Sequence, residues 1–163
     1  MKKIGFSGIK GCGKTTLLNE VKKILSLKSN TQLTSKSDIN NPFDEDKKLS
    51  FNSQFFNFTQ CINQENLLFD TSSGFLLCDT TILDYYLQWQ QSFSEKEKTP
   101  ALEERDELLR YLFKFWIPTY DVLFFIIRGT DTALVAIVPA LANRGLLEVE
   151  LENARRRILE IMG

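Results

Sequence analysis

The sequence contains no histidine and only three cysteines, and both facts limit the chemistry that the chain can perform. Without an imidazole, a general base would have to be a carboxylate, and a bound metal ion would have to take oxygen ligands. Cys12, Cys61 and Cys78 are odd in number, far apart and without a C-x-x-C pair. This spacing argues against a disulfide framework and against a thiolate metal site.

The chain also lacks an excess of charge and a long apolar run. Its 20 lysines and arginines nearly balance its 21 aspartates and glutamates, so the composition offers no support for a nucleic-acid or membrane surface. No secretory hydrophobic segment precedes the first β-prone run, and no apolar run is long enough to cross a bilayer. We therefore expect a cytoplasmic protein whose partners are small molecules.

The length and the apolar content indicate one globular domain. A chain of 163 residues can bury a substantial core, and a hydrophobic fraction of 43% with a charged fraction of 25% is typical of globular proteins. We expect residues 1–163 to form a single domain.

The most specific pattern is the stretch GIKGCGKTT, residues 8–16, which is called the glycine loop below. It matches the phosphate-binding template G-x-x-x-x-G-K-[ST], with Gly8, Gly13, Lys14 and Thr15 at the fixed positions. The β-prone run Ile4–Phe6 precedes the loop, as the template requires. Apolar residues at helical spacing follow it, at Leu17, Leu18, Val21, Ile24 and Leu25.

The residue types of the glycine loop suit a nucleoside triphosphate. Glycines allow consecutive backbone N–H groups to surround an anion, and the positive end of the following helix adds its field. Lys14 would supply a charge for the outer phosphates, and the Thr15 hydroxyl would hold Mg²⁺. The predicted ATP-binding residues are Gly8, Gly11, Cys12, Gly13, Lys14, Thr15 and Thr16. The alternatives are a turn that only joins a strand to a helix and, for Cys12, a small packing residue.

Periodicity predicts the remaining elements. Helical spacing is seen around Phe51 to Ile62, from Ile82 to Trp89, and from Thr99 to Pro118; strands are expected at Gln32–Lys36, Phe75–Cys78 and Val122–Ile127. The segment Ala133–Ala142 is compatible with either a strand or a helix, and Leu147–Ile161 has the pattern of a terminal helix. The phenylalanines at positions 51, 55 and 58 are either core residues or, for one ring, a platform for a base.

The alternation of strands and helices predicts an α/β fold in three layers. Its parallel sheet of four or five strands would be covered by helices on both faces. Ligands bind at the carboxyl ends of strands in such sheets, where Gly8, Asp38, Asp79 and Arg128 would lie. Asp38 is a candidate for binding a substrate hydroxyl, or else a turn residue.

Asp79 ends the apolar run FLLC and is the second candidate for chemistry. An acid in this position can bind Mg²⁺ or take a proton from an attacking hydroxyl, and the alternative is that it caps the next helix. Thr80 follows it where many ATPases that drive motion have a glutamate to orient water, which favours transfer to a substrate over hydrolysis. An N-K-x-D motif for reading guanine is absent.

Four features follow one another along the chain: GIKGCGKTT, a helix bearing Gln54, Gln60 and Gln64, FLLCDTTILDYY and IPTYDVLFFI. In this order they resemble P-loop small-molecule kinases of the ribosylnicotinamide kinase type. These belong to the nucleoside and nucleotide kinase superfamily, and the similarity covers most of residues 1–128. The resemblance implies a P-loop NTPase fold and ATP- and Mg²⁺-dependent phosphoryl transfer to a small nucleoside-like or nucleotide-like acceptor.

The same resemblance assigns roles by position. Lys14 and Thr15 would bind triphosphate and magnesium, and Asp79 would act as base or metal partner. Asp84 would help to shape the acceptor pocket, its alternative being a solvent-facing helix acid. A lid around residues 128–146 would bring Arg128 and Arg144 to the transferred charge. The alternative function is a nucleotide-binding switch or ATPase module that acts on a protein partner.

Overall fold

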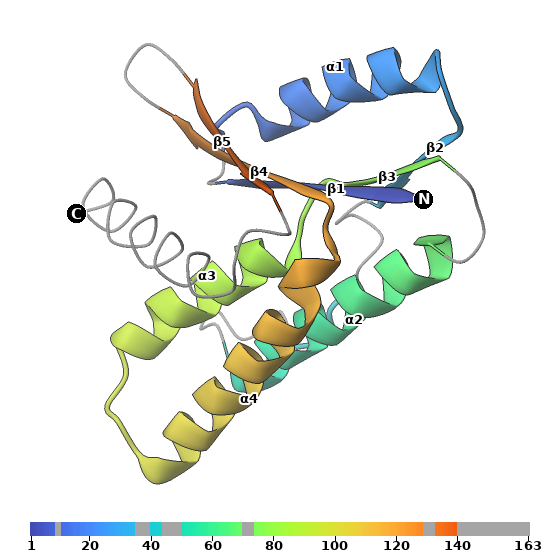
Figure 1. Cartoon of the computed structure of the whole chain (residues 1–163). Helices are drawn as coiled ribbons and strands as arrows, with labels where there is room; N and C mark the ends of the chain where they lie inside the picture. Colours follow the sequence, from blue (N-terminus) through green and yellow to red (C-terminus); the bar gives the residue numbers. More distant parts are fainter. Residues whose placement is uncertain (9–10, 35–39, 44–49, 70–73, 129–132, 140–163) are drawn as a thin grey trace.

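The computed structural model describes residues 1–8, 11–34, 40–43, 50–69, 74–128 and 133–139, which form one sheet with helices on both of its faces (Figure 1). Side chains are described up to residue 126. The elements in chain order are β1 (Lys2–Gly8), α1 (Lys14–Ser26), β2 (Thr31–Thr34), α2 (Phe51–Phe69), β3 (Phe75–Cys78), α3 (Ile82–Ser94), α4 (Pro100–Trp116), η2 (Ile117–Thr119), β4 (Val122–Arg128) and β5 (Ala133–Pro139).

The sheet has the strand order β2-β3-β1-β4-β5. The first four strands are parallel, as predicted, but β5 is antiparallel to β4. Within the ambiguous segment Ala133–Ala142, residues 133–139 are therefore strand. The reason for the antiparallel pairing is the connection: only residues 129–132 separate the two strands, and a parallel crossover needs a dozen or more residues.

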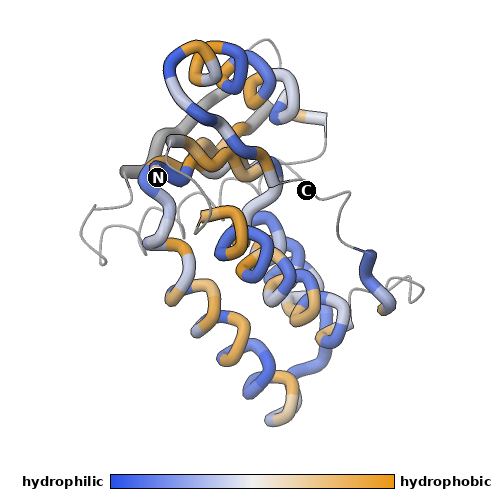
Figure 2. Tube along the Cα trace, turned by 90° about the vertical axis from the view of Figure 1, so that its right-hand side faces the viewer, coloured by the Kyte–Doolittle hydropathy of each residue, from blue (hydrophilic) through white to orange (hydrophobic). Residues whose placement is uncertain are grey.

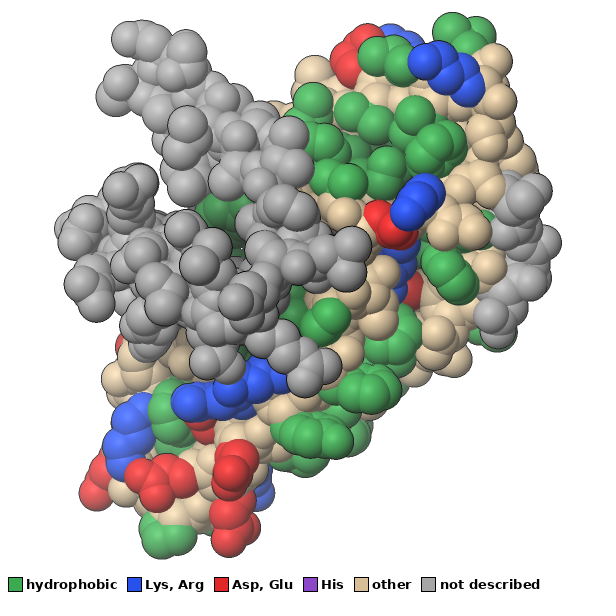
Figure 3. Space-filling view, in the orientation of Figure 1, with side chains coloured by type: hydrophobic (Ala, Val, Ile, Leu, Met, Phe, Trp, Pro, Cys, Tyr) green, Lys and Arg blue, Asp and Glu red, His purple; other side chains and the backbone are tan. Residues whose placement is uncertain are grey.

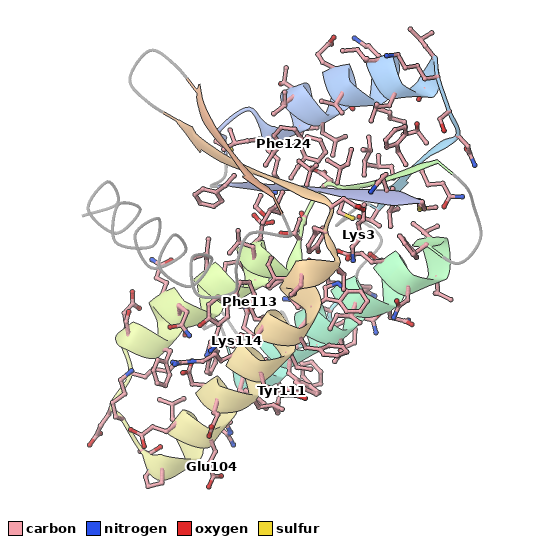
Figure 4. All side chains as sticks on the ribbon, viewed as in Figure 1. Lys3, Glu104, Tyr111, Phe113, Lys114 and Phe124 are labelled. Atoms are coloured by element: carbon pink, nitrogen blue, oxygen red, sulfur yellow. The ribbon has the colours of Figure 1, made fainter. Side chains whose placement is uncertain are left out.

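Alternating side chains of the strands supply the two halves of the core. Phe75 and Leu77 of β3 pack on the side of α1, whereas Leu76 and Cys78 pack on the side of α2, α3 and α4. Figure 4 shows the same division for Phe124, which points toward α1, and Lys3, which points toward the other helices. In Figure 2 the hydrophobic strands lie between these two helical layers. The predicted three-layer α/β architecture is thus compatible with the structure.

The buried face of α2 differs from the predicted one. Phe58 is fully buried, but Phe55 is 36% exposed. The side chains that α2 buries with Phe58 are Ser53, Gln54, Cys61 and Glu65. Hydrophobic spacing could not reveal this face, because three of its five buried side chains are polar. In α1, likewise, Ile24 of the predicted apolar stripe is 57% exposed.

Capping residues fix where two helices begin. Thr99 accepts a hydrogen bond from the Leu102 N–H and precedes Pro100, which confirms the predicted start of α4. Thr81 and Asp84 form a reciprocal capping box at the start of α3, which continues beyond the predicted end to Ser94. Among the helices in the described ranges, none combines the length and the apolar character needed to cross a membrane.

Candidate functional site

The sheet topology brings the carboxyl ends of β1 and β3 side by side at one edge of the sheet. These neighbouring strands lead to helices on opposite faces of the sheet, since β1 continues into α1 and β3 into α3 (Figure 1). In open α/β sheets such a point is where ligands bind. Gly8 ends β1, Asp79 follows β3 and Arg128 ends β4, so the structure places all three at this edge as predicted.

The glycine loop needs its glycines for two different reasons. A Cβ atom on Gly8 would lie 2.5 Å from the Ile126 carbonyl oxygen and 2.8 Å from the Cys12 sulfur, so a side chain would not fit there. Gly11 and Gly13 have φ values of 80° and 89°, which other residues rarely adopt. The buried side chain of Cys12 fills the space beside Gly8, as expected of a small packing residue.

The first turn of α1 presents the polar residues of the glycine loop. Lys14 is the first residue of the helix, and the side chains of Thr15 and Thr16 are exposed. The residue before the helix is Gly13, which has no side chain, and no other described side chain caps the helix N–H groups. This arrangement leaves the positive end of the helix available for an anion.

Lys14 lies close to a buried acid. Its Nζ atom is 3.6 Å from Oδ1 of Asp84, whose side chain is 8% exposed. The interpretation of Asp84 as a solvent-facing helix acid is therefore wrong. Its predicted role in shaping the acceptor pocket stays a prediction.

Asp84 joins the start of α3 to the end of β1. Its Oδ1 accepts a hydrogen bond from the Gly8 N–H at 3.1 Å, and its Oδ2 accepts from the Thr81 N–H at 2.8 Å and from the Ser7 hydroxyl at 3.1 Å. The hydroxyls of Ser7 and Thr81 also bond to each other. Sequence reasoning missed Ser7 and Thr81, although the T-x-x-D spacing from Thr81 to Asp84 is a capping-box signal.

Asp79 is partly buried beside this cluster. Burial raises the pKa of its carboxyl above the usual value; the positive charge of Lys14 opposes this rise, and the negative charge of Asp84 adds to it. Its Oδ1 atom is buried and has no hydrogen-bond partner in the described part of the chain. The alternative role of Asp79 as the cap of α3 is wrong, because Thr81 occupies that position.

The oxygen atoms present suit a magnesium ion held jointly with phosphate. Within the described residues, no group of three or more cysteine and acidic side chains is placed to hold a metal ion alone. Mg²⁺ is usually bound by one or two protein oxygens together with phosphate oxygens and water. Asp79, which has an unpartnered oxygen, and Thr15, which is exposed, supply oxygen atoms of the kind that Mg²⁺ binds.

Three of the predicted site residues cannot be placed in full. Asp38 and Arg144 lie outside the described residues, as does the side chain of Arg128, whose backbone is at the carboxyl edge. The lid and the acceptor contact of Asp38 stay predictions.

Comparisons of the whole chain with models of known protein families and with curated proteins give no match.

Proposed function

We propose that the protein catalyses ATP- and Mg²⁺-dependent phosphoryl transfer to a small nucleoside-like or nucleotide-like acceptor. The observation that carries this proposal is the proximity of the charged groups of Lys14, Asp79 and Asp84 at the carboxyl ends of β1 and β3, beside the glycine loop. One cation, one partly buried acid and a glycine-rich turn before a helix are the parts that triphosphate chemistry uses. We also propose that the fold is that of the P-loop NTPases, as the resemblance of the sequence implies.

The positive groups at the start of α1 suggest how the phosphoryl donor, ATP, would be bound. The N–H groups at the start of α1 and the ammonium of Lys14 would bind the outer phosphates, while Thr15 would hold the metal ion; Asp79 would either join Thr15 there or act as the base. When bound, Mg²⁺ neutralises phosphate charge and orients the transferred group. The task left to the protein is to bring two negatively charged groups together in line.

The acceptor half needs a group that takes a proton. Asp79 would accept the proton of the acceptor hydroxyl while the acceptor oxygen forms a bond to the γ-phosphorus. ADP then leaves with the electrons of the broken P–O bond. A carboxyl whose pKa is raised by burial is a better base at neutral pH than an ordinary one. Arg128 and Arg144 are the candidates for stabilising the transferred charge.

Replacing Lys14 tests the proposal directly. We expect Lys14→Ala to lower phosphoryl transfer by at least about 100-fold, because the variant loses charge stabilisation at the phosphates. ADP production with a panel of nucleosides and nucleotides measures the loss, and circular dichroism checks that the fold survives. Lys23→Ala, an exposed change on the same helix, is the matched control. Undiminished transfer in Lys14→Ala would contradict the proposal.

The same panel separates a kinase from a nucleotide-dependent switch. A kinase produces ADP faster when its acceptor is added to ATP and Mg²⁺, and the phosphorylated acceptor can be identified by mass spectrometry. Failure of every nucleoside and nucleotide to stimulate ADP production would favour a switch or ATPase that acts on a protein partner.

A further inference from the structure

We infer that Asp84 is a positioning residue that fixes Lys14 and the first residue of the glycine loop for triphosphate binding. This inference rests on the proposed function and assigns Asp84 a task in the donor site. It concerns contacts that the side chain makes with the loop itself, in addition to its contacts within α3.

The two oxygens of the Asp84 carboxylate serve different elements. Oδ2 accepts the Thr81 N–H and completes the capping box of α3. Oδ1 faces away from the cap toward the glycine loop, where it accepts the Gly8 N–H at 3.1 Å and lies 3.6 Å from Nζ of Lys14. A helix cap requires only the first of these sets of contacts, so the second set needs another explanation.

Contacts on two sides hold Gly8 in place. On one side its N–H bonds to Asp84, and on the other its missing side chain allows close approach of the Ile126 carbonyl on β4. The start of the loop is thereby tied to both α3 and β4. A binding site whose backbone is already fixed loses less entropy when an anion binds.

The position of Lys14 also depends on the carboxylate. A lysine has a long flexible side chain, and ordering it costs conformational entropy. Asp84 is 8% exposed and Lys14 is 19% exposed, so their attraction is screened less than that of a surface pair. The carboxylate therefore holds the ammonium near Asp79 at the carboxyl edge of the sheet, where a phosphate would meet it.

An amide could not replace this carboxylate without loss. The atoms around Asp84 are donors on both sides: the N–H and the ammonium at Oδ1, and the Thr81 N–H and Ser7 hydroxyl at Oδ2. In Asp84→Asn the side-chain NH₂ group would face donors in either orientation. The loop or the cap must then lose its partner.

The test compares Asp84→Asn with Thr81→Ala, which removes the hydroxyl contacts to Ser7 and to Oδ2 of Asp84 and leaves both contacts of Oδ1 with the loop. Calorimetric titration with a non-hydrolysable ATP analogue and Mg²⁺ gives the affinity, and the melting temperature gives the stability. We expect both variants to melt earlier, with about a tenfold loss of affinity in Asp84→Asn and less than about twofold in Thr81→Ala. Asp106→Asn, a buried acid on α4, should lower stability but not affinity.

Asp84→Glu keeps the charge and the usual acid of a capping box, so it provides a second measurement if Asp84→Asn does not fold. Its longer side chain should preserve most of the melting temperature but move the carboxylate from Gly8 and Lys14, which lowers the affinity. Equal affinity losses in Asp84→Asn and Thr81→Ala, or unchanged or tighter binding in the Asp84 variants, would overturn the inference. A wild-type protein that binds no analogue would instead refute the proposed function.

Discussion

At the scale of single residues, Asp79 is the clearest case of a side chain placed at a cost to stability. It is partly buried, its Oδ1 has no hydrogen-bond partner in the described part, and a second acid lies nearby. Burial and the charge of Asp84 outweigh the attraction of Lys14 and raise its pKa above 3.8. Groups with such environments are frequent in active sites, where function and stability compete.

We predict that Asp79→Asn raises the melting temperature at neutral pH and abolishes most of the turnover. A carboxyl with a raised pKa binds its proton more tightly in the folded state, so folding loses stability as the pH rises from 3.8 through the folded pKa. Below both values the carboxyl is protonated in both states, and this titration no longer contributes. The stabilisation of the variant should therefore grow as the pH is raised from 3 through the folded pKa and then stay constant, as followed by thermal unfolding.

Asp121→Asn is the control of opposite sign. Burial alone would raise the pKa of Asp121, but hydrogen bonds from the Lys2 side chain and the Lys3 N–H lower it overall. Its charge thus contributes stability that is lost as the pH falls below 3.8. The Asp121 variant should melt at a lower temperature than the wild type at neutral pH. A lower melting temperature for Asp79→Asn as well would contradict the prediction that the charge of Asp79 destabilises the fold.

At the scale of secondary-structure elements, α2 departs most from its sequence pattern. Its inner face carries Gln54, which is fully buried and whose amide nitrogen and oxygen have no hydrogen-bond partner among the described residues. The flanking rings of Phe51 and Phe58 contact Trp89 and Tyr85 of α3. A buried amide without partners costs stability, because it has given up its hydrogen bonds to water.

We predict that Gln54→Leu stabilises the protein by about 1 kcal/mol, since it removes this desolvation cost at nearly constant volume. Urea unfolding followed by circular dichroism measures the change in the free energy of unfolding. Gln64→Leu, at a partly exposed position on the same helix, should change it little. A clear destabilisation by Gln54→Leu would show that the amide is paired in solution.

At the scale of the whole molecule, one buried ion pair joins the sheet to the helical layer. Nζ of Lys3 on β1 lies 2.8 Å from Oε2 of Glu65 on α2, and both side chains are at most 3% exposed. Glu65 also accepts hydrogen bonds from the Trp116 indole and the Tyr120 hydroxyl. The ammonium is 4.3 Å and 4.4 Å from the centres of these two rings, so this charge is enclosed by α2, the end of α4 and Tyr120, which lies between η2 and β4.

We predict that Lys3→Met destabilises the protein by about 3 kcal/mol, because it leaves the charge of Glu65 buried without its cation. The control is Lys2→Met, which breaks the more exposed pair with Asp121 and should cost less than about 1 kcal/mol. Denaturant unfolding of both variants gives the comparison. In the double variant Lys3→Met with Glu65→Gln, the loss should be smaller than the sum of the single losses.

The outer surface of the same helical layer shows what remains exposed. Leu108, Tyr111 and Phe115 of α4 are at least 44% exposed, whereas Phe113 stacks on Tyr86 of α3. Figure 4 shows Tyr111 and Phe113 on different sides of α4, and Figure 3 shows hydrophobic side chains beside charged ones on this face of the molecule. The helix thus has apolar residues on both its buried and its exposed sides, so hydrophobic spacing alone does not define which side is buried.

The sequence by itself determined the features that depend on a few neighbouring residues. The glycine loop between β1 and α1, the cap at Thr99 and the order of strands and helices follow from backbone preferences, hydrogen bonds within one turn and the period of apolar side chains. The placement of Gly8 and Asp79 at the carboxyl edge follows too, because each ends an apolar run that forms a parallel strand.

Only the tertiary structure decided which groups meet across those elements. Ser7, Lys14 and Asp84 come together through the packing of β1, α1 and α3, and the pairing of Lys3 with Glu65 spans more than sixty residues of sequence. These contacts depend on burial and on the direction of side chains in three dimensions, which local patterns do not encode. The glycine loop was therefore evident from the sequence, whereas the carboxylate that holds it was identified only from the fold.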